Sequence, residues 1–236
     1  MGNDAVATEF FADELLERLS QRILRMEQGE RLPSERLYAE ELGVSRTALR
    51  DRLGRLESMG ILERRTGSGS YVRGLQPKAV SDSLMLGLIA SQLTIESLRS
   101  VRFALERQAA YEAAQRVNHI EVARMAIAVD RMEAAEDTQE LYDADIEFHR
   151  ALFAASESPA LIFFATVLHD VLSRTMRHLE LSEDRVQMRK LHRAIHSSVT
   201  LRDAAAAMRA IDEHFIWLEK FVARTEPSKS TPPRTP

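Results

Sequence analysis

Four residues in the second half of the chain have side chains that commonly bind metal ions in proteins. Asp145 and His149 lie four positions apart in a segment with a helical pattern, so both side chains project from one face. His192 and His214 fall on the apolar faces of two further helical segments, and His196 is an additional candidate one turn beyond His192. Carboxylate and imidazole groups are the usual ligands of zinc, nickel, iron and manganese. The spacing alone leaves open a second interpretation, in which each histidine is an ordinary core or surface residue.

A second group of residues has the charge needed to bind nucleic acid. The whole chain has a net charge of −4, but the stretch from Val44 to Gly74 holds seven arginines against three acidic residues, a local excess of four. That excess suits contact with phosphate groups, although a solvated helix face would have the same charge. The arginines are Arg46, Arg50, Arg52, Arg55, Arg64, Arg65 and Arg73, and the acids are Asp51, Glu57 and Glu63.

The elements around this basic stretch have the order of a winged helix-turn-helix. Ser34 and Ser45 are predicted to cap the second and third helices, and Gly43 ends the second so that the two can cross steeply. A glycine-rich turn then joins two short strands into a hairpin. We predict helices over residues 10–26, 35–42 and 46–59, and strands over residues 61–65 and 70–73.

In a winged helix-turn-helix, the third helix enters the major groove of DNA and presents its first turn to the bases. Arginine can donate two hydrogen bonds to guanine O6 and N7, and hydroxyl groups can reach phosphate or base. Arg36 begins the second helix and is placed to contact phosphate, while Gly67 at the wing tip allows close approach to DNA. The predicted DNA-binding residues are therefore Arg36, Ser45, Arg46, Thr47, Arg50 and Gly67.

The rest of the chain has a helical pattern almost to its end. The predicted helices lie near residues 80–91, 94–117, 120–135, 137–156, 159–180, 184–200 and 203–223. The fold class is therefore mostly α, with an N-terminal winged helix-turn-helix and a C-terminal all-α helical bundle. The predicted domains are residues 1–74 for DNA binding, a linker at 75–82, a helical effector, metal-binding and dimerisation domain at 83–223, and a disordered tail at 224–236.

The composition is consistent with a helical protein inside the cell. Hydrophobic residues make up 44% of the chain and aromatic residues 6%, which is enough for one large or two modest cores. There is no cysteine, so disulfides and thiolate sites are excluded. Charges interrupt every apolar run, and the first residues lack the basic flank of a signal peptide. We therefore expect a cytoplasmic protein with no membrane partner.

The N-terminal motifs resemble the GntR family of bacterial regulators. The resemblance rests on four segments in the family's order and spacing: residues 32–36, 42–50, 56–62 and 67–72, which read LPSER, LGVSRTALR, LESMGIL and GSGSYV. It implies that Arg36, Arg46, Arg50 and Gly67 correspond to the family's DNA-contacting positions. The chain departs from the family pattern at residues 26–31 and 51–52, and neither departure includes these four positions.

The C-terminal half resembles the FCD effector domain of the FadR subfamily of these regulators. The resemblance rests on residues 98–106, on the D-x-x-F-H-x-x-L segment at 145–152, and on the spacing from His192 to His214. It implies that Asp145, His149, His192 and His214 hold one divalent ion, with zinc first and nickel, manganese or iron as alternatives. It also implies that a small organic acid fills the open positions of the ion and that Arg102 pairs with its carboxylate. The alternative for Arg102 is an ion pair with Glu106 on the same helix.

These interpretations predict a DNA-binding transcription regulator, a repressor rather than an enzyme. Its homodimer reads an inverted repeat, and a small carboxylate effector changes the population of DNA-competent dimers. One alternative keeps the regulator but makes the ion purely structural. Another is a metal-dependent hydrolase, suggested by His169-Asp170, although this pair is common by chance and the winged helix has no role in a hydrolase. His169 and His196 stay open as further candidates for the pocket.

Overall fold

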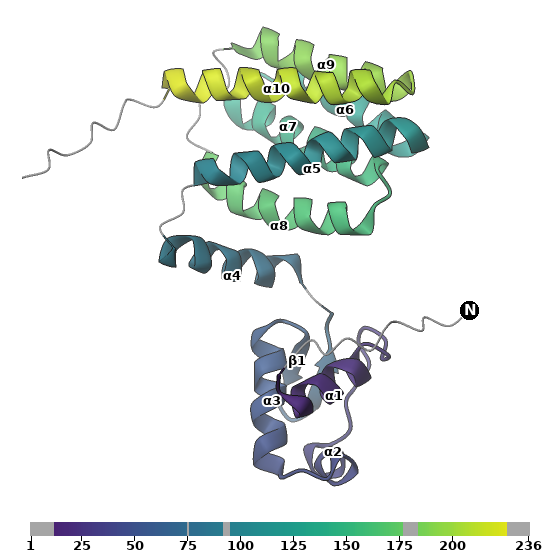
Figure 1. Ribbon diagram of the computed structural model, residues 1–236, viewed down its shortest axis with the longest axis vertical. Helices are drawn as coiled ribbons and strands as arrows, with labels where there is room; N and C mark the ends of the chain where they lie inside the picture. The colour runs from purple at the N-terminus through teal and green to yellow at the C-terminus, as the bar shows by residue number, and fades with distance from the viewer. Residues whose placement is uncertain (1–11, 75, 92–94, 177–183, 226–236) are drawn as a thin grey trace, which may run out of the picture. The chain divides into compact units, whose positions relative to one another are not determined.

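The computed structural model describes residues 12–74, 76–91, 95–176 and 184–225. The chain divides into two compact units, one ending at Val80 and the other beginning at Ser81. The first holds short helices and a small sheet, and the second holds a bundle of long helices (Figure 1). The predicted fold class is therefore confirmed. Within the described residues, no helix has both the length and the apolar character needed to cross a membrane.

Side-chain caps set the helix boundaries in the first unit. The helices are α1 (Glu14–Ile23), α2 (Glu35–Leu42) and α3 (Arg46–Ser58). Ser34 and Ser45 cap α2 and α3 as predicted, and Gly43 ends α2 in the left-handed conformation, with a φ of 69°. The prediction for α1 was too long, because Asp13 caps this helix at its start and α1 ends at Ile23. The predicted positions 10 and 11 lie outside the described residues.

The wing is a two-stranded antiparallel sheet anchored at its base. Strand β1 (Leu62–Arg65) pairs with β2 (Gly69–Val72), with Leu62 opposite Val72 and Arg65 opposite Gly69. Leu62 and Val72 are buried in the core formed with the three helices. At the outer edge of the sheet, Arg31 forms an isolated bridge with Tyr71. The base of the wing is therefore held by apolar packing, and the turn at its tip projects away from this core.

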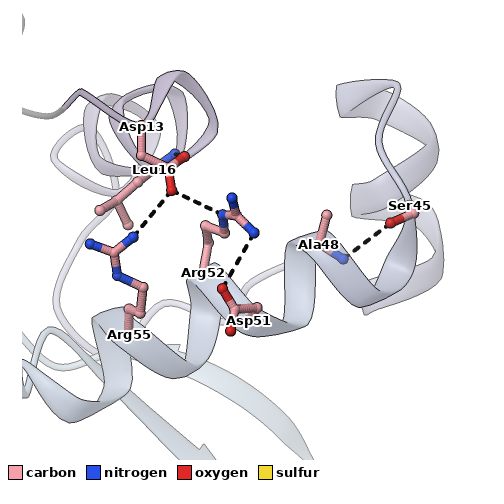
Figure 2. A network of polar contacts seen from close by, with 7 residues as sticks. All are labelled: Asp13, Leu16, Ser45, Ala48, Asp51, Arg52 and Arg55. Atoms are coloured by element: carbon pink, nitrogen blue, oxygen red, sulfur yellow. Dashed lines mark hydrogen bonds and ion pairs between the residues drawn. The ribbon is translucent and has the colours of Figure 1, made fainter.

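Asp13 ties the first helix of this unit to the third. Its Oδ1 accepts a hydrogen bond from the Leu16 backbone amide at 3.1 Å, and its Oδ2 accepts from Arg52 Nε at 3.0 Å and from Arg55 at 3.1 Å (Figure 2). The amide of Leu16, assisted by the two guanidinium groups, lowers the pKa of Asp13 below its usual value of 3.8. One carboxylate therefore caps α1 and joins it to α3, and two of the seven arginines of the basic stretch are used within the fold.

An Asp13→Asn variant should unfold at a temperature a few degrees lower than wild type at pH 7, because it loses two ion pairs and part of a helix cap. The folded-state pKa of Asp13 is depressed, so its contribution is present above pH 3.8 and is lost as the pH falls through the folded pKa. The difference between the two proteins should therefore shrink in acid. Asp51→Asn is the matched control, since Asp51 is exposed and pairs with Arg52 alone at 3.3 Å. Equal unfolding temperatures for Asp13→Asn and wild type at pH 7 would contradict this role.

Part of the predicted linker is helical. Helix α4 runs from Pro77 to Ala90, so it begins three residues before the predicted helix at 80–91 and includes residues 77–79 of the predicted linker. Proline is favoured in the first turn of a helix, where its missing N–H is not needed, so Pro77 starts this helix. From Ser81 onward α4 belongs to the second unit, where Ser81 Oγ donates to the Val167 carbonyl at 3.1 Å.

Six further helices form the rest of the second unit within the described residues. They are α5 (Ile95–Arg116), α6 (His119–Ala134), α7 (Thr138–Ala155), α8 (Pro159–Met176), α9 (Arg185–Thr200) and α10 (Ala204–Thr225). All six were predicted, and the ends that lie within the described residues are shifted by at most two residues. Residues 177–180 of the predicted 159–180 helix lie outside the described residues, as does the predicted tail from residue 226. Residues 224 and 225, expected in that tail, are the last residues of α10.

The core of the second unit brings together helices that are distant in sequence. Helix α6 packs on α7, and α10 packs on both α5 and α9 (Figure 1). Fully buried apolar side chains from these helices, including Met125, Phe148, Ile195 and Ile211, form one continuous cluster. Burial of this apolar surface stabilises the bundle. Side chains from the inner faces of α7, α9 and α10 also meet, since the ring of Phe148 contacts that of His192 and the ring of His149 contacts that of His214. These faces hold the predicted metal ligands.

Candidate functional site

The predicted DNA-binding residues of the first unit are all exposed. Arg46, Thr47 and Arg50 lie on the first turns of α3, and Ser45 Oγ accepts the capping hydrogen bond from the Ala48 amide at 3.1 Å (Figure 2). The cap therefore uses an acceptor of Ser45, while its hydroxyl proton can still be donated. These residues lie at the N-terminal end of α3, where a helix also attracts anions.

The other two predicted DNA contacts come from the elements before and after α3, since Arg36 lies on α2 and Gly67 lies in the turn between β1 and β2. Arg36 is exposed on α2 and pairs with Glu40 at 3.0 Å. Gly67 is exposed at the wing tip with a φ of 72°, and a side chain placed there would meet nothing within 4 Å. The positive φ is a conformation that glycine adopts without strain. The open space around Gly67 leaves its backbone accessible to a phosphate.

The basic stretch has less free charge than the sequence suggested. Five of its seven arginines form ion pairs with acidic residues of the same unit. Arg50 is one of them, since its Nε and a terminal nitrogen contact Glu35 at 3.1 and 2.7 Å. Within residues 12–74, no ion pair of Arg46 or Arg73 is found. Arg46 is therefore the cation of the recognition helix best placed to meet DNA without first leaving a partner.

The four predicted metal ligands come together inside the second unit. Asp145 and His149 lie on α7, His192 lies on α9 and His214 lies on α10, and one donor atom of each falls within 4.8 Å of the others. His192 Nε2 is 2.9 Å from Asp145 Oδ1 and 3.4 Å from His149 Nε2. All three histidines are buried. Three helices therefore direct one carboxylate and three imidazoles at a common point.

Burial and charge act against each other at this point. Burial alone would raise the pKa values of Asp145 and Glu106, but the neighbouring basic side chains have the larger effect. The pKa of Asp145 therefore lies well below its usual value. The pKa of Glu106 falls to about 2. Burial lowers the pKa of His149, but the same two carboxylates outweigh it and raise the value to about 9. Burial and two adjacent imidazoles hold the pKa of His214 well below its usual range. The carboxylates are therefore ionised at neutral pH, as ligands of a cation must be.

The donor set suits a divalent transition metal ion. Opposite ligands on an ion with bonds of about 2.1 Å lie about 4.2 Å apart, so small side-chain shifts would close these four donors around one ion. His214 Nδ1 is buried and has no hydrogen-bond partner among the described residues, an arrangement that costs free energy unless another group binds there. Imidazole favours zinc and its neighbours in the periodic table over calcium or magnesium, which prefer oxygen ligands.

A cavity of about 280 Å³ lies beside this cluster. Asp145, His149 and His214 form part of its wall together with Arg102, and most of the remaining wall is apolar, including Phe153. A mostly apolar cavity with a few polar groups in its wall is typical of a site for a small organic molecule.

Of the two histidines left open by the sequence, His169 lines the cavity and His196 does not. Burial, with the nearby cation of Arg150, lowers the pKa of His169 to about 4, so its imidazole is neutral. His196 lies within hydrogen-bond distance of Thr200 on its own helix, with its Nε2 3.4 Å from the hydroxyl oxygen. The structure thus adds His169 to the cavity and separates His196 from it.

Glu106 is a residue of this site that the sequence reasoning did not assign to it. It is almost completely buried on α5, contacts Arg102 through one oxygen, and places the other 2.9 Å from His149 Nδ1. Arg102 therefore forms the ion pair considered as an alternative to effector binding, and it also lines the cavity. The spacing of Arg102 and Glu106 was visible in the sequence, but the contact between Glu106 and His149 joins two different helices.

Comparisons with known proteins agree with both halves of this description. Residues 11–72 match the bacterial regulatory proteins of the gntR family, and residues 97–216 match the FCD domain. The chain is 29% identical over 202 residues to the HTH-type transcriptional regulator LutR of Bacillus subtilis, covering 83% of this chain and 92% of that protein. It is 27% identical over 227 residues to the putative L-lactate dehydrogenase operon regulatory protein of Escherichia coli, covering 90% and 86%.

A solved structure supports the same assignment. Streptococcus agalactiae GntR is 26% identical, with a TM-score of 0.71, over 92% of this chain and 100% of that one. The winged helix-turn-helix, the helical bundle and the named relatives all point to gene regulation and none to an enzyme. The chain therefore belongs to the gntR family of bacterial regulatory proteins, and is a transcriptional regulator with an N-terminal DNA-binding domain and a C-terminal FCD domain.

Proposed function

We propose that this protein is a cytoplasmic repressor whose grip on DNA is controlled by a small organic acid bound at a divalent metal ion. The observation that carries the proposal is the convergence of Asp145, His149, His192 and His214 beside a cavity. Three of these four residues, all but His192, line the cavity together with Arg102. The four converging residues would hold the ion, with zinc as the leading candidate. When bound, such an ion supplies a Lewis-acid site with open positions that a carboxylate can fill.

Arg102 would bind the acid beside the ion. Its side chain is partly buried and contacts Glu106 through Nε, and the terminal nitrogens can bind a carboxylate in a forked arrangement. The apolar remainder of the wall would pack against the carbon skeleton of the acid. The named relative that regulates an L-lactate dehydrogenase operon makes L-lactate the first acid to try.

On the DNA side, we propose that the protein acts as a homodimer. Two copies of α3 would then read the two halves of an inverted repeat, with Arg46, Thr47 and Arg50 at the bases and Arg36, Ser45 and Gly67 at the backbone. The acid would change the affinity for DNA only if it binds one arrangement of the dimer more tightly than the other. Under this proposal, acid binding favours the arrangement that releases DNA.

Thermal unfolding with L-lactate, succinate and citrate tests the acid site. Zn²⁺-loaded wild type should unfold at a higher temperature with at least one of these acids, since a ligand at 100 times its Kd stabilises by about 2.7 kcal/mol. Arg102→Gln should lose most of this shift. Arg107→Gln is the matched control, because Arg107 lies on the same helix and pairs with Asp212 outside the cavity. No shift of the wild type with any acid would contradict the effector role.

The same cluster also supports a second candidate, in which the ion is purely structural. The four ligands come from α7, α9 and α10, so an ion would hold three helices of the core together. In that case Zn²⁺ alone would raise the unfolding temperature, and the acids would add nothing in wild type or in Arg102→Gln.

A further inference from the structure

Glu106 stands out because its carboxylate is 1% exposed and yet serves two neighbouring sites. One oxygen contacts Arg102 Nε, four residues earlier on α5, and the other lies 2.9 Å from His149 Nδ1 on α7. Burying a carboxylate costs free energy unless its oxygens are compensated. Here the compensation comes from one side chain of the cavity and one of the metal cluster, so Glu106 links the two.

The contact with His149 determines which of its ring nitrogens can bind an ion. A carboxylate attracts the nitrogen that carries a proton, so His149 keeps its proton on Nδ1, which faces Glu106, and Nε2 is the nitrogen that must be deprotonated to bind an ion. Nε2 is the atom that faces the cluster, at 3.5 Å from Asp145 Oδ1 and 3.4 Å from His192 Nε2. Glu106 therefore orients His149 with the ligand nitrogen toward the ion.

His192 shows the same principle with a different partner. Its Nδ1 lies 2.8 Å from the Met188 carbonyl, one turn earlier on α9, which leaves Nε2 facing Asp145 at 2.9 Å. A backbone carbonyl can orient the ring, but it cannot connect it to another side chain. The Glu106 carboxylate, in contrast, joins an oriented ligand of the cluster to a cation in the wall of the cavity.

We propose that Glu106 is a positioning residue shared by the metal centre and the acid site. It holds His149 so that Nε2 binds the ion, and it holds Arg102 by Nε so that its terminal nitrogens are directed to the acid. This inference rests on the proposed function. It adds that the two sites share one buried carboxylate, so a change at position 106 must affect metal binding, acid binding or both.

The chemistry of glutamine makes this inference testable with a substitution of nearly equal size. Glutamine has one acceptor oxygen and one donor NH₂ group, whereas Arg102 Nε and His149 Nδ1 both require an acceptor. A glutamine at position 106 can therefore satisfy one of them and must face the other with a donor. Glu112→Gln is the matched control, because Glu112 lies on the same helix, pairs with Arg116 four residues away and is absent from the cavity wall.

The experiment is a Co²⁺ titration of the full-length protein, followed by its visible absorption spectrum, and then a titration with L-lactate, succinate and citrate at saturating Co²⁺. Loss of an outer partner of a metal-binding histidine lowers metal affinity about 10- to 100-fold. We expect Glu106→Gln to bind Co²⁺ about 10- to 100-fold more weakly with an altered spectrum, or to lose affinity for the acid by a similar factor. Glu112→Gln should bind both Co²⁺ and the acid as wild type does. Glu106→Asp keeps the charge but is too short for both contacts, so it should fall between the two and serves as the test if Glu106→Gln does not fold.

The outcomes separate this inference from the proposed function. Wild type that binds Co²⁺ and acid, beside a Glu106→Gln or Glu106→Asp variant that binds both within twofold of wild type, would overturn the inference alone. Wild type that binds no Co²⁺ would overturn the proposed metal site and, with it, this role of Glu106. Wild type that binds Co²⁺ but none of the acids would overturn the shared role.

Discussion

Replacing Arg46 with alanine should weaken specific DNA binding by about 1–3 kcal/mol, which is about 5- to 150-fold in Kd. Arg46 is exposed on the first turn of α3, and within residues 12–74 no acidic partner holds it. Its guanidinium can therefore fork onto a guanine without breaking an existing ion pair. Arg50, by contrast, must leave Glu35 before it can reach DNA, so the net loss from Arg50→Ala should be smaller.

This prediction is checked by fluorescence anisotropy on a duplex selected by the protein from a random pool, at one stated salt concentration. Arg46→Lys is the matched variant, because lysine keeps the charge and loses the fork. It should retain the salt dependence of wild type while losing discrimination between the selected duplex and a scrambled one. If Arg46→Ala bound the selected duplex as tightly as wild type, α3 would not read DNA through this residue.

Replacing His149 with alanine should abolish stoichiometric binding of Zn²⁺. His149 is buried, contacts both Glu106 and Asp145, and supplies one of the four ligands that converge among the described residues. An ion at 1,000 times its Kd stabilises the folded state by about 4.1 kcal/mol, so wild type should gain about this much from excess Zn²⁺ and His149→Ala almost nothing. Elemental analysis after gel filtration and chemical unfolding with and without Zn²⁺ measure the two effects.

His196→Ala provides the control for that experiment. His196 lies on α9 one turn from His192 but outside the cluster and the cavity wall, so its loss should leave zinc content and zinc-dependent stability unchanged. A fall in zinc content equal to that of His149→Ala would show that the ion binds elsewhere. Unchanged zinc content in His149→Ala would contradict the site itself.

Features set by neighbouring residues could be predicted from the sequence. The caps at Ser34 and Ser45 and the end of α2 at Gly43 depend on hydrogen bonds and backbone angles within a few positions. The common face of Asp145 and His149 follows from the helical period in the same way. Helix α4 begins three residues before the predicted start at residue 80, because Pro77 stands in its first turn, where proline is favoured.

Features that join distant segments could not be derived from local pattern. Asp13 meets Arg52 and Arg55 across 39 and 42 positions, so the basic stretch looked more available to DNA than it is. The contact of Glu106 with His149 likewise crosses from α5 to α7. The convergence of α7, α9 and α10 on one point was expected only through the family resemblance, because helix spacing does not reveal which helices pack together.

The most direct test of the central claim is the effect of the acid on DNA affinity. The Kd for the selected duplex would be measured with Zn²⁺-loaded protein, with and without whichever of L-lactate, succinate and citrate raises its unfolding temperature. Couplings between two binding sites typically amount to 1–3 kcal/mol, so we predict DNA binding about 5- to 150-fold weaker with the acid in wild type and unchanged in Arg102→Gln. An equal Kd with and without the acid in Zn²⁺-loaded wild type would contradict the account.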